Sequence, residues 1–235
     1  MTLTREATDP RKAWYIIVGA VLVNQYSLTL TRASPNRCLS RLKLIARRRL
    51  TRVEIETNTG WLDSVRRVVS PNCDERPTGL LPELIVIHGI SLPPGQFGGL
   101  AIDKLFSNRL VAAEHPYFCN IIDLRVSSHV LISRRGIPTQ YVPFEKRAWH
   151  AGESWYCGRA ECNDFSVGIE LEGTDDSPYE YIQYKRLAEL VRVLRRAYPS
   201  LRDAEIVGHS DIAPGRKTDP GVCFDWKLLG RLLES

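Results

Sequence analysis

The sequence predicts an α/β fold in which a mixed central β-sheet is flanked by helices. Apolar or alternating runs typical of buried strands occupy residues 83–91, 129–144 and 164–173, and an amphipathic stretch typical of a helix occupies 177–199. Strands and helices thus follow one another along the same part of the chain, which favours one domain around a central sheet. The 235 residues, of which 43% are hydrophobic, are enough to bury one core.

Two of the predicted strand regions end in a loop or contain a turn. The segment ELIVIHGIS at 83–91 is a short apolar run that ends at His88, and it predicts a buried strand opening into a loop. The segment HVLISRRGIPTQYVPF at 129–144 predicts two strands joined by a turn near Gly136. This second region therefore has the pattern of a hairpin.

The third predicted strand, DFSVGIELEG at 164–173, alternates strictly along its length. The apolar side chains on one face are Phe165, Val167, Ile169 and Leu171. Glu170 and Glu172 share the opposite face. Alternation alone does not distinguish which of these two carboxylates has a functional role.

The clearest predicted helix covers 177–199. Ser177 is expected at its N-cap, with Glu180 three residues later completing a capping box. Apolar residues then recur at helical spacing, namely Leu187, Leu190, Val191, Leu194 and Tyr198. Two shorter helices are expected around 101–110 and over 226–234.

The net charge of +5 is concentrated near the N-terminus. Residues 1–60 contain 11 Lys and Arg against 4 Asp and Glu, whereas residues 61–235 contain 21 against 23. The body of the protein is therefore near neutral and lacks the basic surface that binds a phosphate backbone. We expect no nucleic-acid partner.

Residues 1–59 are predicted to be a basic N-terminal extension to a compact domain at 60–235. Their apolar run AWYIIVGAVL at 13–22 resembles the start of a signal peptide or membrane anchor. Polar residues follow before a full span of about 20 apolar residues is reached. Three interpretations stay open: a poorly ordered or non-native extension, an anchor or signal, and a docked appendage. A membrane contact is expected only through 13–22.

The cysteine pattern indicates reduced thiols in a reducing compartment. The six cysteines are Cys38, Cys73, Cys119, Cys157, Cys162 and Cys223. None forms a C-x-x-C pair, and a chain with its own core has little need of disulfides. A bridge between Cys157 and Cys162 is the alternative.

Histidine and acidic residues recur where the predicted strands run into loops. His88 ends the first strand, and the loop segment VGHSDIAPGRKTDPG at 207–221 contains His209 and Asp219. A catalytic zinc ion takes three protein ligands and leaves its fourth position to water. These two histidines and one aspartate are therefore a candidate ligand set. Their spacing is weak evidence alone, because a polar loop is more often a solvated surface.

Five segments strengthen this interpretation by their resemblance to the zinc N-acetylmuramoyl-L-alanine amidase family, which includes phage lysozyme-type amidases and peptidoglycan recognition proteins. In order, they are IHGISLPPGQFGG, RVSSHVLI, QYVPFEKRAWHAG, CNDFSVGIELEGTD and GHSDIAPGRKTDPG. The resemblance runs from about residue 60 to about residue 226. It implies a mixed sheet with packed helices, one Zn²⁺ per chain, and hydrolysis of the amide between N-acetylmuramic acid and L-alanine.

The resemblance also assigns roles to individual residues. It implies that His88, His209 and Asp219 bind zinc, and that Glu170 and Lys217 are catalytic. Zinc lowers the pKa of a bound water from 15.7 to about 7. Glu170 would take the proton of that water and pass it to the leaving amine. Lys217 would help stabilise the oxyanion of the tetrahedral intermediate.

Two further residues match family positions that bind substrate. Arg125 matches an arginine that engages the stem peptide, and a surface salt bridge is its alternative role. Trp149 matches an aromatic residue suited to stacking on a sugar ring, and ordinary core packing is its alternative. His150 is either a residue of the substrate cleft or a structural one, and His129 is either a core histidine or part of the cavity wall.

The sequence departs from the family pattern near the site. Gly89 follows the first predicted ligand where relatives commonly carry Asn, which removes a hydrogen-bonding side chain. Glu161 stands where close relatives have an arginine that helps to bind the peptide. Recognition of stem-peptide carboxylates is therefore expected to weaken or change unless Arg159 takes that role.

The predicted function is hydrolysis of small-molecule muropeptides, with the 1,6-anhydro form preferred, during peptidoglycan recycling. A cytoplasmic location and a monomeric state are expected. One rival is a periplasmic or phage-like amidase acting on intact murein, which an export signal at 13–22 would favour. The other is a peptidoglycan-recognition module that binds muropeptide without cutting it.

Overall fold

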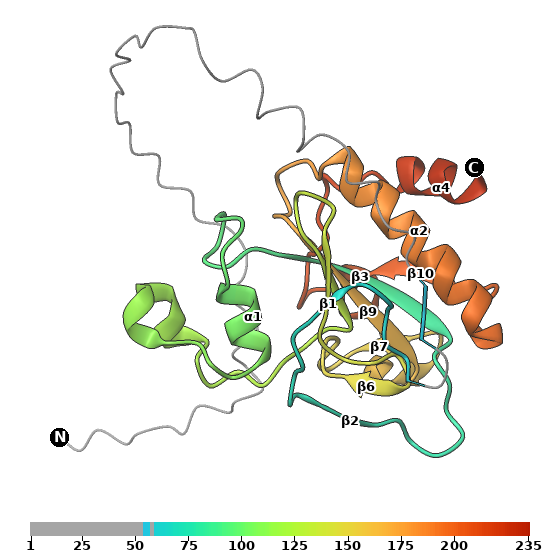
Figure 1. Cartoon of the computed structure of the whole chain (residues 1–235), viewed down its shortest axis with the longest axis horizontal. Helices are drawn as coiled ribbons and strands as arrows, with labels where there is room; N and C mark the ends of the chain where they lie inside the picture. The colour runs from blue at the N-terminus through green and yellow to red at the C-terminus, as the bar shows by residue number, and fades with distance from the viewer. Residues whose placement is uncertain (1–53, 57–58) are drawn as a thin grey trace, which may run out of the picture. The chain divides into compact units, whose positions relative to one another are not determined.

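A six-stranded mixed sheet forms the centre of the computed structural model, which describes residues 54–56 and 59–235 (Figure 1). In spatial order its strands are β1 (Arg66–Arg67), β5 (Pro138–Gln140), β4 (Val130–Ile132), β9 (Ser166–Glu172), β3 (Leu84–Ile90) and β10 (Glu205–Gly208). Strands β4, β9, β3 and β10 run parallel, and β5 pairs antiparallel with β4. The predicted α/β class and the hairpin around Gly136 are thus confirmed.

The other elements lie around this sheet. Two small antiparallel sheets pair β2 (Cys73–Glu75) with β6 (Lys146–Ala148) and β7 (Trp155–Tyr156) with β8 (Arg159–Ala160). The helices are α1 (Ala101–Phe106), α2 (Tyr181–Ala197), α3 (His209–Ile212) and α4 (Trp226–Glu234). Short 3₁₀ turns are η3 (Ala112–Glu114), η4 (Pro116–Asn120), η5 (Cys162–Asp164) and η6 (Pro199–Leu201).

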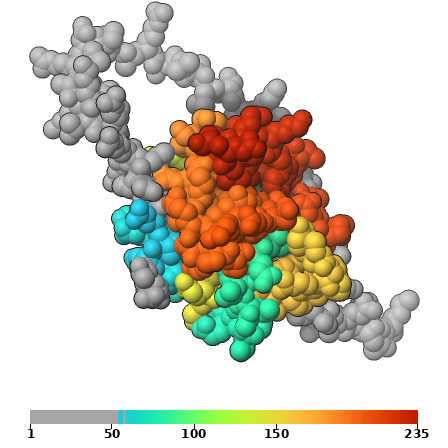
Figure 2. Space-filling model, turned by 90° about the vertical axis from the view of Figure 1, so that its right-hand side faces the viewer, coloured from blue at the N-terminus to red at the C-terminus, as the bar shows by residue number. Residues whose placement is uncertain are grey.

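The sheet is buried on both faces, as is typical of parallel strands that are covered by helices. On one face, β3 and β9 contribute Ile85, Ile87, Val167, Ile169 and Leu171 to a core that α2 and α4 complete. Figure 2 looks onto these two helices, drawn in orange and red. This face contains the largest apolar cluster of the described residues and holds the two central strands rigidly.

The opposite face carries the polar residues of the candidate site. Along β3 and β9 successive side chains alternate, so His88 and Glu170 point away from the α2 core. Helix α1 and the 3₁₀ turn η4 build a second apolar cluster on this side together with Leu131 and Tyr141. The functional face is therefore bordered by one polar and one apolar region.

Helix α2 begins later than predicted. Its first residue is Tyr181 and its N-cap is Glu180, so the expected N-cap at Ser177 is wrong. The Glu180 amide N–H donates to Gln183 Oε1 at 2.9 Å, which places the capping box three residues further along. The Pro178 carbonyl accepts instead from the Arg134 guanidinium.

Helix α1 is shorter than the predicted 101–110 and ends at Phe106. Asn108 has a φ of 56°, in the left-handed region, which stops the helix there. The C-terminal helix covers Trp226–Glu234 as predicted.

Most of the predicted extension at 1–59, including 13–22, lies outside the described residues. Ile55 forms a bridge with Leu62, and it packs against the α2-side core. The boundary between 59 and 60 stays a prediction. In the part of the chain that the structure describes, no helix combines the length and apolar character needed to cross a membrane.

The five described cysteines have free thiols, including Cys157 and Cys162. Cys162 is buried within η5 and Cys157 is exposed.

Candidate active site

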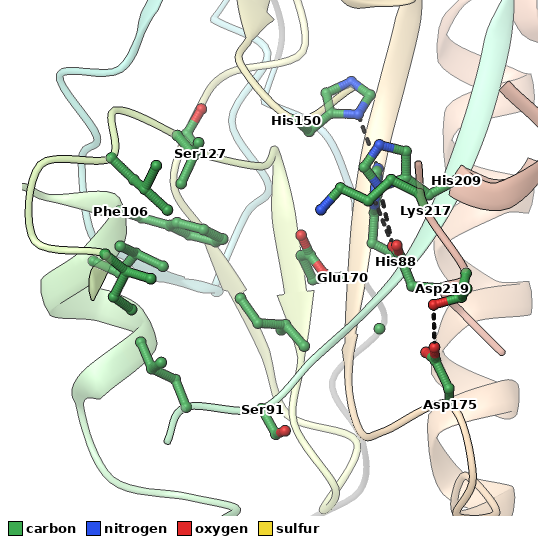
Figure 3. A pocket seen from close by; sticks show the side chains of 18 of the residues that line it. His88, Ser91, Phe106, Ser127, His150, Glu170, Asp175, His209, Lys217 and Asp219 are labelled. Carbon is green, nitrogen blue, oxygen red and sulfur yellow. Dashed lines mark hydrogen bonds and ion pairs between the residues drawn. The ribbon is translucent and has the colours of Figure 1, made fainter. Parts of the chain in front are cut away.

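His88 and Glu170 project from the two central strands into one cavity. Strands β3 and β9 are parallel, and their register places His88 directly opposite Glu170. Paired positions on neighbouring strands carry their side chains on the same face. Both side chains therefore line the cavity shown in Figure 3.

Strand β10 brings His209 to the same place because it pairs in parallel with β3. His209 is the first residue of α3 and directly follows Gly208 at the end of β10. The loop after α3 then folds back, and the Ser210 amide N–H donates to the Asp219 carbonyl at 3.0 Å. Asp219 consequently lies beside His209 although ten positions separate them.

The three predicted metal ligands converge. His88 Nδ1 lies 2.9 Å from His209 Nδ1 and 3.2 Å from Asp219 Oδ2. His209 Nδ1 lies 3.1 Å from the same Asp219 oxygen. The three potential ligand atoms all fall within 4.8 Å of one another. Residues far apart in the chain thus form one compact donor set.

This donor set fits a zinc ion by its chemistry. Two imidazole nitrogens and one carboxylate oxygen are ligand types that zinc takes in catalytic sites. Burial, together with the neighbouring His209, lowers the pKa of His88 to about 4, which keeps its imidazole neutral. Burial alone would raise the pKa of Asp219, but His209 and His88 lower it below its usual value and keep the carboxylate charged.

The structure separates the two glutamates that share the polar face of β9. Glu172 has both carboxylate oxygens occupied, because it accepts from the backbone N–H groups of Gly98 and Arg134. Glu170 lines the cavity, and its buried Oε2 has no hydrogen-bond partner among the described residues. Burial, and then the charge of Asp219, raise the pKa of Glu170 well above its usual value. Of the two glutamates, Glu170 is thus the one whose carboxylate faces the cavity with an unpartnered oxygen.

Lys217 extends into the cavity towards Glu170 (Figure 3). The residue is only 9% exposed, so its ammonium group is largely removed from solvent. Burial lowers the pKa of Lys217 to about 8, against the opposing charge of Asp219. A positive charge in this position can stabilise negative charge that develops near the ligand set.

The cavity has a volume of about 250 Å³ and two chemically different ends. The polar end holds His88, Glu170, His209, Lys217 and Asp219. The apolar end, between α1, η4 and the sheet, includes Leu92, Leu105, Phe106, Ile121, Leu124 and Val126. The cavity therefore offers both polar and apolar contacts to a ligand.

Two histidines that the sequence left ambiguous have different positions. His129 is fully buried and lies outside the cavity lining, and its ring accepts from the Gly168 amide N–H at 3.0 Å. Burial, then the charge of Arg76, lowers the pKa of His129 to about 3. His150 lines the cavity and contacts His88, with 2.9 Å between His150 Nδ1 and His88 Nε2. His129 is therefore a core histidine, whereas His150 belongs to the site.

The two predicted substrate-binding residues lie outside the cavity lining. Arg125 is exposed, and its guanidinium donates to the carbonyls of Ile122 and Leu124. Trp149 is half-buried, and its indole N–H donates to Asp74 Oδ1 at 3.2 Å. Their contact with substrate stays a prediction.

Arg159 and Glu161 also lie outside the cavity lining. Arg159 forms an ion pair with Glu83 at 2.5 Å and lies over the ring of Phe165. Glu161 is exposed and has a φ of 58°. The structure thus places Arg159 in a surface ion pair.

Gly89 has a packing reason. A Cβ at this position would lie 2.2 Å from Tyr179 Oη. The Tyr179 hydroxyl donates to the Pro220 carbonyl at 2.9 Å, directly after Asp219. The space beside the first predicted ligand is therefore filled by a tyrosine that comes from the other side of the strand.

Sequence reasoning missed Asp175, which lines the cavity and accepts a hydrogen bond from the Thr218 hydroxyl. It stands within the segment CNDFSVGIELEGTD, but no periodicity or spacing marks it. The apolar end of the cavity was missed as well, because its residues come from three separate segments.

Comparison with known proteins identifies a family and close relatives. Residues 78–222 match the family described as N-acetylmuramoyl-L-alanine amidase. The 1,6-anhydro-N-acetylmuramyl-L-alanine amidase AmpD of Salmonella typhimurium is 56% identical over 174 residues, which cover 74% of this chain and 92% of that protein. AmpD of Escherichia coli is 56% identical over 167 residues, which cover 71% of this chain and 91% of that protein.

Solved structures of AmpD and AmpDh3 also resemble this chain. The chain resembles the crystal structure of a Se-Met AmpD derivative with a TM-score of 0.73 and 52% identity, over 76% of this chain and 99% of the other. It also resembles AmpDh3 from Pseudomonas aeruginosa with a TM-score of 0.50 and 27% identity, over 70% of this chain and 65% of the other.

Proposed function

Because the chain belongs to the N-acetylmuramoyl-L-alanine amidase family, we propose that it is a zinc-dependent amidase of peptidoglycan recycling. Its reaction is hydrolysis of the amide between N-acetylmuramic acid, preferably in the 1,6-anhydro form, and L-alanine. The observation that carries the proposal is the convergence of His88, His209 and Asp219 beside Glu170 and Lys217 in one cavity.

His88, His209 and Asp219 would hold the zinc ion. When bound in such a site, zinc acidifies water and polarises a carbonyl group. The neutral imidazole of His88 and the ionised carboxylate of Asp219 suit a zinc ion, and His209 would supply the third ligand through a ring nitrogen.

Glu170 would act as the general base and then as the general acid. It would take a proton from the attacking water and deliver it to the amide nitrogen, so that L-alanine leaves as a neutral amine. Its raised pKa suits both steps, because a carboxylate with a pKa nearer neutrality accepts and returns a proton more easily. The unpartnered Oε2 supports this role.

Lys217 would stabilise the negative charge that forms on the amide oxygen during attack. Its side chain enters the cavity from the loop that also supplies Asp219. Loss of one such donor typically costs about 3 kcal/mol of transition-state stabilisation. The buried position strengthens the interaction, because water screens it poorly.

We also propose a cellular location, an oligomeric state and a zinc content for the enzyme. The enzyme would work as a cytoplasmic monomer with one zinc ion per chain and a small-molecule muropeptide as substrate. The catalytic domain would comprise residues 60–235. Arg125 and Trp149 would contact the parts of the stem peptide and the sugar that extend beyond the cavity, because neither residue lines it.

The test uses the purified full chain and anhydro-muramyl-tripeptide, with products followed by mass. We expect release of free tripeptide, and its loss with a chelator and in the variants Glu170→Ala and His209→Ala. Tight muropeptide binding without cleavage, at full zinc occupancy, would instead establish a recognition module and overturn the proposal.

A further inference from the structure

Both candidate histidine ligands are held from behind by two consecutive residues. His88 and His209 turn their Nδ1 atoms towards Asp219, which leaves each Nε2 on the far side. His88 Nε2 lies 2.9 Å from His150 Nδ1, and His209 Nε2 lies 3.1 Å from the Ala151 carbonyl (Figure 3). One short segment therefore contacts both imidazoles opposite the metal-binding side.

The chemistry of the partners fixes where the protons lie. A carbonyl only accepts, so His209 donates a proton from Nε2, and it would bind the metal ion through Nδ1. His88 can do the same only if His150 Nδ1 accepts. His150 Nε2 then carries the proton and donates to Ser166 Oγ at 3.2 Å, while the Ser166 hydroxyl donates to the Cys162 carbonyl at 2.5 Å. Each donor in this series of hydrogen bonds, from His88 to Ser166, therefore has one acceptor.

The segment that makes these contacts is itself fixed by the fold. Asn163 Oδ1 accepts from the backbone N–H groups of His150 at 3.0 Å and Ala151 at 2.8 Å. Gly168 leaves room for the imidazole, since a Cβ there would lie 2.4 Å from the His150 ring. The Arg216 guanidinium also donates to the Ala151 carbonyl, at 2.6 Å. The histidine is thus held on its side-chain and backbone ends.

We propose that His150 is a positioning residue of the metal centre: its Nδ1 accepts from His88 Nε2 and thereby fixes the tautomer and ring orientation of that ligand. This inference rests on the proposed function, because it assumes that His88 binds zinc. Partners of this kind behind a ligand histidine typically change metal affinity 10- to 100-fold when they are removed. His150 itself touches neither the substrate nor the metal in this role.

The test measures zinc affinity of the full chain by competition with a chromophoric chelator, so it does not depend on turnover. His150→Leu removes the acceptor, and we expect zinc affinity to fall about 10- to 100-fold. His150→Asn keeps an amide oxygen near the place of Nδ1, and we expect it to restore most of the affinity. Ser166→Ala removes only the hydroxyl that accepts from His150 Nε2, so it should lower zinc affinity by a smaller factor.

The control is His115→Asn, a change at a histidine that lies outside the cavity lining, contacts Tyr117 and Phe118, and contacts neither the proposed ligand histidines nor His150. Its zinc affinity should equal that of the wild-type chain, even if its unfolding temperature falls. A wild-type zinc affinity in His150→Leu would overturn the inference. An equal loss of zinc affinity in His150→Leu and His150→Asn would also overturn it, because the shape of the side chain and not its acceptor atom would then matter. Failure of the wild-type chain to bind zinc would instead overturn the proposed function. If His150→Leu does not fold, the other two variants still test the inference. A zinc affinity that is unchanged in Ser166→Ala and greatly reduced in His150→Asn would contradict it.

Discussion

His88 and Glu170 stand opposite each other in the parallel register of β3 and β9. The register fixes the distance between a proposed metal ligand and the proposed proton-transfer group through backbone hydrogen bonds rather than through flexible loops. The neighbouring residues on both strands, Ile87 and Ile169, belong to the α2-side core, which anchors the backbone that carries the pair.

Glu170→Gln removes the carboxylate but keeps its size. We expect kcat to fall by about 10²- to 10⁴-fold, the usual contribution of general acid–base catalysis, while zinc content stays near one per chain. Steady-state kinetics on anhydro-muramyl-tripeptide and metal analysis measure both quantities. Glu172→Gln is the matched control on the same strand face: it should lower the unfolding temperature, through its lost contacts to Gly98 and Arg134, and leave kcat of the folded protein nearly unchanged. A larger loss of kcat in Glu172→Gln than in Glu170→Gln would contradict the assignment.

The two glutamates also show what the sequence could and could not predict. Alternation correctly placed both on the polar face of one strand, because side-chain direction follows from local backbone geometry. The two glutamates differ because Glu172 accepts from the backbone N–H groups of Gly98 and Arg134. These donors lie 74 and 38 positions away in the sequence, so no local pattern contains them. Residue types alone made the three proposed zinc ligands a weak candidate set, and the family resemblance strengthened it. Their convergence depends on the pairing of β10 with β3, which no local pattern contains. His150 escaped assignment for the same reason: its contact with His88 spans 62 positions.

Metal removal should destabilise the protein. A ligand that binds only the native state adds about 2.7 kcal/mol at a free concentration of 100 times its Kd. We therefore expect a chelator to lower the Tm of the wild-type chain, and added zinc to restore it. In His209→Ala the Tm should respond to neither addition, because one of three ligands is missing. Equal responses of the variant and the wild-type chain in scanning fluorimetry would show that zinc binds elsewhere.

Lys217→Gln should reduce catalysis more than binding. Removal of one charge-stabilising donor from an active site typically lowers kcat by about 10²- to 10³-fold. The KM for anhydro-muramyl-tripeptide should change by a much smaller factor, since the charge that Lys217 stabilises is absent from the ground state. Lys227→Gln serves as the control, because Lys227 is exposed and lies outside the cavity lining, and its kcat should equal that of the wild-type chain. If Lys217→Gln raised KM and left kcat intact, Lys217 would be a substrate-binding group.

The buried His129 should make stability depend on pH. Its pKa is depressed from 6.5 to about 3 in the native state, so below pH 6.5 the unfolded chain binds a proton that the native chain does not. The stabilisation is fully present above pH 6.5 and is lost as the pH falls towards 3. One such group removes about 2 kcal/mol of unfolding free energy between pH 7 and pH 5.

Urea unfolding of the metal-free chain at both pH values measures this loss, since metal release then plays no part. His129→Asn should be less stable than the wild-type chain at pH 7, yet lose about 2 kcal/mol less on acidification. The difference between the two chains isolates His129 from the other buried histidines. Identical pH dependence in both chains would mean that His129 is not neutral in the native state or not buried.

Gly89 and Tyr179 should be energetically coupled, because a Cβ on Gly89 would lie 2.2 Å from the tyrosine hydroxyl and 3.5 Å from the ring carbon that bears it. Gly89→Ala should therefore cost about 1–3 kcal/mol of unfolding free energy, the usual cost of overpacking. Tyr179→Phe removes the clashing oxygen and the hydrogen bond to the Pro220 carbonyl, which costs about 1 kcal/mol by itself. In the double variant the Cβ meets only the ring edge, so the two losses should sum to more than the measured total. Urea unfolding of the four chains gives the coupling energy directly. Strict additivity would show that the new methyl group does not press on the Tyr179 hydroxyl, and the expected coupling between the two residues would then be wrong.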